Sequence, residues 1–329
     1  MQMTSANGAT PLAIEMNGLS KHFGPHRAVD TLNLTVSAGT VFGFLGPNGA
    51  GKTTTIRMLL GLIRPTKGSG RILGYDIERE RRAILPQVGA IVESPAFYPI
   101  LSGRDNLRVL ARTAGLEDAQ NIAHVLEQVG LRERAHDKVR TYSLGMKQRL
   151  AIAAALLNSP QIIFLDEPTN GLDPAGTVEI RELIRALGAS GHTIFLSSHL
   201  MHEVEQVCGE VAIIDHGKLV TQGRVADLLR RESSLLIEAE PLSILQEVVA
   251  RFGVTPQVNG SRTVTVALPA ERTPELMKAL VNADASVYQV TPQHASLEHL
   301  FLELTDDAHG VHHPPVEQEV RAAALAERK

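Results

Sequence analysis

The stretch Gly46–Thr53 constrains the fold of this 329-residue chain more than any other feature. It reads Gly-Pro-Asn-Gly-Ala-Gly-Lys-Thr, between an apolar run that ends at Leu45 and a helical pattern over Thr54–Leu60. Glycines let backbone N–H groups close around phosphate oxygens, and the N-terminus of the following helix adds a positive dipole end. This order of strand, glycine-rich loop and helix predicts a P-loop nucleotide site in an α/β domain with a parallel sheet.

Each residue type in the loop has a predicted role. Lys52 is expected to reach the β- and γ-phosphates, and the Thr53 hydroxyl is expected to ligate Mg²⁺. The predicted nucleotide contacts cover the loop and the helix start: Gly46, Pro47, Asn48, Gly49, Ala50, Gly51, Lys52, Thr53 and Thr54.

Two adjacent carboxylates, Asp166 and Glu167, end the apolar run that begins at Gln161. An apolar strand that ends in Asp-Glu is common, but here it lies downstream of a P-loop. We expect Asp166 to hold Mg²⁺, directly or through water, and Glu167 to polarise the water that attacks the γ-phosphate.

The segment Tyr142–Leu150 resembles the signature of the ATP-binding-cassette (ABC) family, which reads roughly Leu-Ser-Gly-Gly-Gln followed by Gln-Gln-Arg. The matching positions are Ser143, Gly145, Gln148 and Arg149. The positions that depart from the commonest form are Tyr142, Leu144, Met146 and Lys147. The resemblance implies a second anion cradle, from Ser143, Leu144, Gly145 and Met146, that faces the γ-phosphate bound to an opposite subunit.

Three further positions follow the order of the ABC motifs. Asn170–Asp173 resembles the D-loop, which implies that Asp173 crosses the dimer interface. His199 follows the apolar run Thr193–Ser198 and resembles the switch histidine that contacts the γ-phosphate. Phe23 lies where the family stacks an aromatic ring on adenine.

Glu93 occupies the position where the family commonly has the Q-loop glutamine, while Gln87 lies six residues too early. A carboxylate there is predicted to ligate Mg²⁺ or its water, with added negative charge near the phosphates. The stretch Glu93–Pro99 and the variant signature resemble exporter ATPases of bacitracin-type peptide-antibiotic self-immunity and of doxorubicin-type drug export.

The remaining pattern divides the chain into segments. We predict a loose lead-in over 1–11, a cassette over 12–230 with a helical subdomain at about 94–160, an α+β module over 234–304 and a disordered tail over 305–329. The module has a β-α-β-β-α-β order that resembles a ferredoxin-like fold. Its predicted elements are Leu235–Ala239, Leu242–Phe252, Val254–Val258, Thr263–Leu268, Pro274–Ala283 and Ser286–Val290, with a closing helix over Ala295–Leu304.

Composition excludes several classes of protein. The 32 Lys and Arg against 36 Asp and Glu leave a net charge of −4, which lacks the basic excess of nucleic-acid-binding proteins. The single cysteine, Cys208, excludes an internal disulfide and is predicted to be a buried small hydrophobe. No apolar stretch reaches the ~18 residues of a membrane span, and the polar N-terminus lacks the order of a signal peptide.

These observations together predict an ATPase at the cytoplasmic face of the membrane that uses ATP and Mg²⁺. The resemblance implies a head-to-tail homodimer, because one cassette cannot offer its P-loop and its signature to the same ATP. It also implies docking on a separately encoded ABC-2-type permease, with Phe97 and Tyr98 as exposed contacts, and no nucleic-acid partner. An importer ATPase, a soluble ABC ATPase that acts on ribosomes or DNA, and a regulator without turnover remain as alternatives.

Overall fold

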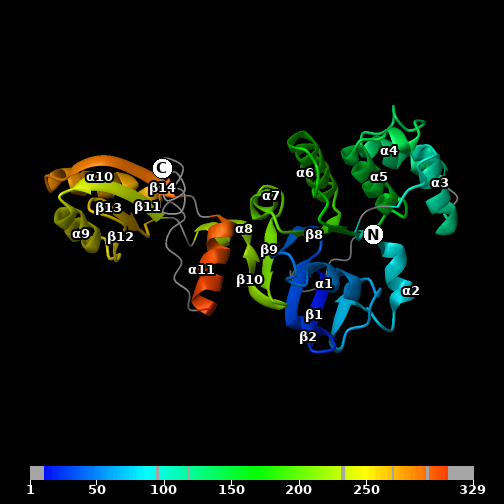
Figure 1. Cartoon of the computed structure of the whole chain (residues 1–329), viewed down its shortest axis with the longest axis horizontal. Coiled ribbons are helices and arrows are strands. Elements are labelled where there is room, and N and C mark those ends of the chain that lie inside the picture. Colours follow the sequence, from blue (N-terminus) through cyan, green and yellow to red (C-terminus); the bar gives the residue numbers. More distant parts are fainter. Residues whose placement is uncertain are drawn as a thin grey trace, which may run out of the picture. The chain divides into compact units, whose positions relative to one another are not determined.

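A computed structural model describes residues 11–93, 96–116, 119–230, 234–268, 270–293 and 296–309. The chain divides into two compact units, Met1–Leu228 and Leu229–Lys329 (Figure 1). Residues 231–233, next to the predicted boundary of the cassette, lie outside the described residues, as do residues 1–10 of the predicted lead-in.

The centre of the first unit is a six-stranded sheet in the order β10-β9-β3-β8-β7-β6. Its strands are β3 (Val41–Leu45), β6 (Val88–Ile91), β7 (Ile162–Asp166), β8 (Thr193–Ser198), β9 (Glu210–Asp215) and β10 (Lys218–Arg224). Strands β9, β3, β8, β7 and β6 are parallel, and only β10 is antiparallel to its neighbour. The predicted parallel sheet is therefore confirmed, and the polar residues that follow its strands share one edge.

A second, antiparallel sheet in the order β2-β1-β4-β5 was not part of the sequence-based prediction. It consists of β1 (Leu12–Phe23), β2 (His26–Ser37), β4 (Lys67–Ile72) and β5 (Tyr75–Asp76). Strands β1 and β2 form a long hairpin in which Phe23 pairs with His26. The hairpin escapes a search for short apolar runs because its inward side chains alternate with polar ones.

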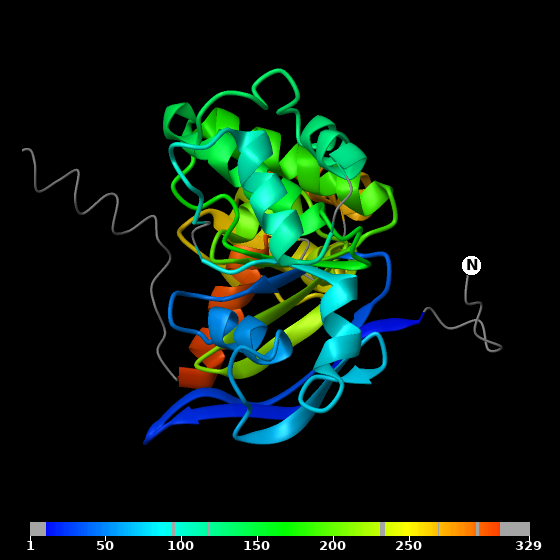
Figure 2. The same ribbon diagram turned by 90° about the vertical axis from the view of Figure 1, so that its right-hand side faces the viewer.

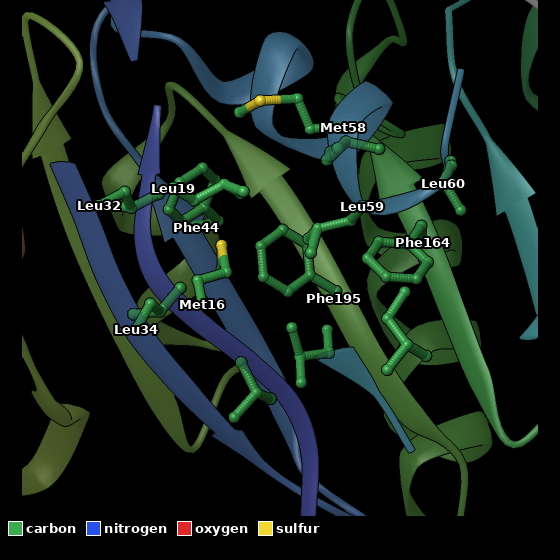
Figure 3. Packing of buried hydrophobic residues seen from close by; sticks show 14 of the residues in the cluster. Met16, Leu19, Leu32, Leu34, Phe44, Met58, Leu59, Leu60, Phe164 and Phe195 are labelled. Atoms are coloured by element: carbon green, nitrogen blue, oxygen red, sulfur yellow. The ribbon is translucent and has the colours of Figure 1, made fainter. Parts of the chain in front are cut away.

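Four phenylalanines fill the space between these layers. The ring of Phe195 on β8 lies 5.6 Å from Phe42, 5.2 Å from Phe44 and 5.4 Å from Phe164, measured between centroids. Figure 3 shows Met16, Leu19 and Leu34 from the β1–β2 hairpin and Met58 and Leu59 from the P-loop helix packed around Phe44 and Phe195. One continuous core therefore joins the antiparallel sheet, the P-loop helix and the parallel strands.

The helices of the first unit fall into two groups. The P-loop helix α1 (Lys52–Leu59) packs against β7, and α6 (Pro174–Ala189) packs against β3 and β8. Helices α3 (Gly103–Thr113), α4 (Ala119–Gln128) and α5 (Leu144–Leu156) form a separate cluster, on the side away from β1 and β2 in Figure 2. The shorter elements are α2 (Arg81–Ile84), η1 (Leu85–Gln87), η2 (Val139–Thr141), α7 (Met201–Glu205) and α8 (Val225–Arg230).

The second unit is a four-stranded antiparallel sheet in the order β12-β13-β11-β14, with its own apolar core. Its elements are β11 (Ser234–Glu240), α9 (Leu242–Arg251), β12 (Gln257–Val258), β13 (Thr263–Val266), η3 (Ala270–Arg272), α10 (Thr273–Asn282), β14 (Ser286–Gln293) and α11 (Leu297–His309). The first strand, β11, lies inside the sheet and pairs with the last strand, β14, which forms one edge. The order of strands and helices along the chain is the predicted β-α-β-β-α-β order.

Several boundaries in this unit differ from the prediction. The predicted strand Val254–Val258 is reduced to Gln257–Val258, since Pro256 has no N–H to donate to a strand partner. The last helix starts after Ser296, whose Oγ accepts a hydrogen bond from the N–H of His299, and it runs to His309. The prediction of a disordered tail from Thr305 is therefore wrong for residues 305–309, where the Thr305 hydroxyl also bonds the carbonyl of Phe301. Residues 310–329, including His312 and His313, lie outside the described residues.

Within the described ranges, none of the helices combines the length and apolar character that crossing a bilayer requires.

Replacing Phe195 by Ala is expected to destabilise the first unit by about 3–5 kcal/mol, because it opens a cavity at the meeting point of three rings. Urea unfolding measures this loss. Leu62→Ala, at an exposed side chain, is the matched control and is expected to change the unfolding free energy by less than about 0.5 kcal/mol. A Phe195→Ala midpoint equal to that of the control would contradict the central role of this ring.

Candidate nucleotide-binding site

The P-loop leaves the end of β3 and turns directly into α1. Gly51 has a φ of 104°, and a Cβ there would lie 2.4 Å from the carbonyl oxygen of Ala28 on β2. At Gly46 a Cβ would lie 2.3 Å from the carbonyl oxygen of Ile214 on β9. Only glycine fits either position, because the loop is pressed between two strands while its backbone curls around the phosphate position.

Lys52 is buried, with 6% of its side chain exposed, and its ammonium group lies inside the loop. Its Nζ donates to the carbonyl oxygens of Gly46 at 2.7 Å and Pro47 at 3.2 Å, and lies 3.2 Å from Oε1 of Glu167. A buried cation with such partners is a prepared site for an anion, since phosphate oxygens are stronger acceptors than neutral carbonyls.

Asp166 and Thr53 meet at the carboxyl end of β7. The Thr53 hydroxyl donates to Oδ2 of Asp166 at 2.8 Å, and the hydroxyl of Ser197 on β8 donates to Oδ1. A hydroxyl and a carboxylate are hard oxygen donors of the kind that Mg²⁺ binds together with phosphate oxygens, so these residues fit that ion. The prediction had no place for Ser197, although a serine near the end of an otherwise apolar strand is a recognisable signal.

Glu167 lies between Lys52 and His199. Its Oε2 is 2.8 Å from Nδ1 of His199, and its Oε1 faces the ammonium group of Lys52. The backbone of Glu167 has a φ of 50°, and its N–H donates to the carbonyl of Ser197 at 3.2 Å. Left-handed backbone is uncommon for a residue with a long side chain, so the strand end fixes this carboxylate at a defined position.

Phe23 is located at the tip of the β1–β2 hairpin, with about half of its surface exposed. Lys21 Nζ lies 5.0 Å from the centre of its ring and donates to the carbonyl of Arg64 at 2.8 Å. Strand β2 brings the hairpin close to the P-loop, because Ala28 packs against Gly51 only two residues after His26, the partner of Phe23. The ring thus has a cation over it, and the hairpin that carries it passes beside the P-loop at Ala28.

The signature residues lie at the start of α5. Ser143 is the N-cap of that helix, and its Oγ accepts a hydrogen bond from the N–H of Met146 at 3.2 Å. Leu144 Cδ2 lies 3.4 Å from where a Cβ on Gly171 would be, so the signature is adjacent to the D-loop. Asp173 caps α6 by accepting from the N–H of Gly176 at 2.9 Å.

Glu93, which is predicted to be a metal ligand, contacts a cationic side chain in this structure. It follows β6, has a φ of 67° and is largely exposed, and its carboxylate forms an ion pair with Arg57 of α1. Among the described residues, no group of three or more His, Cys, Asp or Glu side chains is arranged to hold a metal. The structure therefore brings Thr53 and Asp166 together and leaves Glu93 with Arg57, which the sequence analysis did not consider.

Phe97, Tyr98 and Cys208 differ in their exposure to solvent. Phe97 was expected to be exposed, but it is half-buried in a groove beside β6, whereas Tyr98 is 58% exposed as predicted. Cys208 is buried, as predicted, and burial raises the pKa of its thiol well above the usual range. A thiol that stays protonated has no redox role in this site.

Comparisons with known proteins agree with this geometry. A family model described as "ABC transporter" matches residues 29–170. The chain is similar to the bacitracin transport ATP-binding protein BcrA of Bacillus licheniformis, with 41% identity over 88% of this chain and 96% of that protein. It is also similar to the daunorubicin resistance ATP-binding protein DrrA3 of Streptomyces coeruleorubidus, with 35% identity over 90% of this chain and 96% of that protein.

A solved ATP-binding subunit of an ABC transporter has a similar structure, with a TM-score of 0.59 and 30% sequence identity. The match covers 66% of this chain and 92% of the other.

Replacing Lys52 by Ala is expected to weaken ATP binding about 10- to 100-fold, because the loop loses its buried charge-assisted hydrogen bonds to phosphate. Equilibrium binding of a fluorescent ATP analogue measures the change. Lys278→Ala, an exposed lysine of the second unit, is the control and should bind like the native chain. Equal affinities in all three proteins would refute the phosphate role of Lys52.

Proposed function

The chain belongs to the ABC transporter family, as an ATP-binding protein, and from that membership we propose that two copies of it drive the export of a drug, antibiotic peptide or similar amphiphile. ATP hydrolysis coupled to transport is the activity of this family. The prediction that the chain is the ATPase subunit of an exporter is confirmed by its relatives. The observation that carries the proposal is the convergence of Lys52, Glu167 and His199 beside the phosphate loop.

The three side chains suggest a division of labour during hydrolysis. Lys52 offers its ammonium group to the β- and γ-phosphates and then no longer neutralises Glu167. The freed carboxylate orients a water molecule and accepts its proton. His199 holds Glu167 through Nδ1, which leaves Nε2 directed to other partners such as the γ-phosphate.

Thr53 and Asp166 are the residues that would hold Mg²⁺ with the nucleotide. When bound, the ion neutralises charge on the phosphate oxygens and aligns them. The hydrogen bond between the two side chains keeps both oxygens at one place before the ion and nucleotide arrive, and Ser197 fixes the second oxygen of Asp166.

The placement of the signature supports a homodimer. Leu144 packs beside the D-loop rather than in the P-loop of its own chain, and it is half exposed. The helix start at Ser143 is free to approach the γ-phosphate on a second copy, where its N–H groups suit an anion. ATP then lies between a P-loop and a signature from different chains.

A groove of about 460 Å³ lies between β6 and the helical cluster and suits a permease at the cytoplasmic face of the membrane. Its apolar lining includes Ile91, Phe97, Leu110 and Ala154. A recess of this size with a partly apolar lining suits a short helix of a partner protein. We assign it to a separately encoded ABC-2-type permease.

The substrate class follows from the relatives. One is named for bacitracin transport and another for daunorubicin resistance, and both align with this chain over nearly their whole length. A peptide antibiotic and a drug are different chemicals, and the permease rather than this chain contacts them. The proposed cargo is therefore an amphiphile of one of these types.

Replacing Glu167 by Gln tests the hydrolytic step. Turnover is expected to fall at least about 100-fold while ATP binding is retained, and the variant should accumulate as an ATP-bound dimer. Steady-state ATPase assays and light scattering measure the two effects, with Glu182→Gln on α6 as the control. Rapid turnover by Glu167→Gln removes this residue from its role, and a strictly monomeric variant at saturating ATP, also beside its permease, refutes the dimer.

A charge in the groove tests the permease contact. Leu110→Arg is expected to reduce copurification with a co-expressed permease at least about tenfold, since burying an unpaired charge costs more than about 1.4 kcal/mol. Val178→Arg, at a similarly exposed side chain on α6 outside the groove, is the control. Undiminished copurification of Leu110→Arg would contradict this docking site.

A further inference from the structure

The P-loop helix makes two side-chain contacts with the edge of the parallel sheet. Thr53, at the second position of α1, bonds Asp166 at the end of β7. Arg57, four residues later in the same helix, forms an ion pair with Glu93 beyond the end of β6. Residues spaced by four lie on one face of a helix, so these contacts are successive steps along α1.

Glu93 follows a strand that is paired with β7. Ile91, the last residue of β6, is level with Leu165 on β7, so Glu93 follows the end of the strand beside the one that ends in Asp166. Neighbouring strands lie about 4.8 Å apart, so a glutamate side chain at position 93 is long enough to approach the ion that Thr53 and Asp166 would hold. In this structure its carboxylate instead contacts Arg57.

We propose that Arg57 is a positioning residue that competes with the bound metal ion for the carboxylate of Glu93. With Arg57 paired, Glu93 is not available as a metal ligand and the charge near the phosphates is balanced. With Arg57 released, Glu93 joins the oxygens of Thr53 and Asp166. The inference rests on the proposed Mg²⁺ site.

The same carboxylate lies on the wall of the groove assigned to the permease, together with Phe97 and Leu110. A partner helix seated there contacts the residues around Glu93 and shifts the balance between its two states. Arg57 thus decides whether this carboxylate faces a guanidinium or the metal position. A plain surface ion pair would leave metal binding unchanged when Arg57 is replaced, and this difference makes the proposal testable.

Mn²⁺ serves as the probe, with free Mn²⁺ measured by electron paramagnetic resonance in the presence of a non-hydrolysable ATP analogue and excess protein. Arg57→Met keeps the aliphatic stem of the side chain and removes its charge. It is expected to tighten Mn²⁺ binding about two- to fivefold, which is the range of an exposed ion pair. In the Glu93→Gln background the same substitution is expected to have no effect, because no carboxylate is left to release.

Two controls separate the possible failures. Arg82→Met, an exposed arginine of α2, should leave Mn²⁺ binding unchanged. Thr53→Ala should weaken it, and if it does not, the proposed metal site itself is wrong. If Thr53→Ala weakens binding while Arg57→Met has no effect, or has the same effect with Gln at position 93, the competition is overturned and the metal site stands.

Discussion

The ion pair between Lys52 and Glu167 is the interaction on which the rest of the site depends. It joins the phosphate loop, which follows β3, to the end of β7, on the other side of β8, in a place where water has little access to the lysine. A buried cation is costly unless it is paired, so the site without nucleotide needs the carboxylate as a partner. In the proposed reaction the nucleotide becomes the partner of Lys52, and the carboxylate of Glu167 is released.

The parallel sheet brings the groups that take part in this exchange to the same place. Parallel strands present their carboxyl ends at a common edge, and β3, β7, β8 and β6 are followed there by the P-loop, Glu167, His199 and Glu93. The four phenylalanines beneath that edge pack the strands closely, which keeps the polar ends within hydrogen-bonding distance. Core packing and catalytic geometry are therefore not separable in this unit.

Much of the site was predictable, because its motifs are short and contiguous. The residue spacing within Gly46–Thr53 is enough to predict a phosphate site. Likewise, two carboxylates directly after an apolar strand, Asp166 and Glu167, are enough to predict their roles. Ser197 and Arg57 were missed, since each acts through a residue far away in the chain: 31 residues separate Ser197 from Asp166, and 36 separate Arg57 from Glu93. Phe97 was wrongly placed for the same reason, because the walls of its groove come from β6, α3 and α5.

The sequence by itself determined the class of ligand, the parallel sheet and the membership of a family, because backbone geometry and local spacing suffice for these. Only the tertiary structure decided which charged side chains form ion pairs with one another. Glu93 pairs with the guanidinium of Arg57 on α1, and that pairing depends on how α1 packs against β7 beside β6. Electrostatic pairing falls off over a few ångströms, so helix packing, which no single motif encodes, sets the outcome.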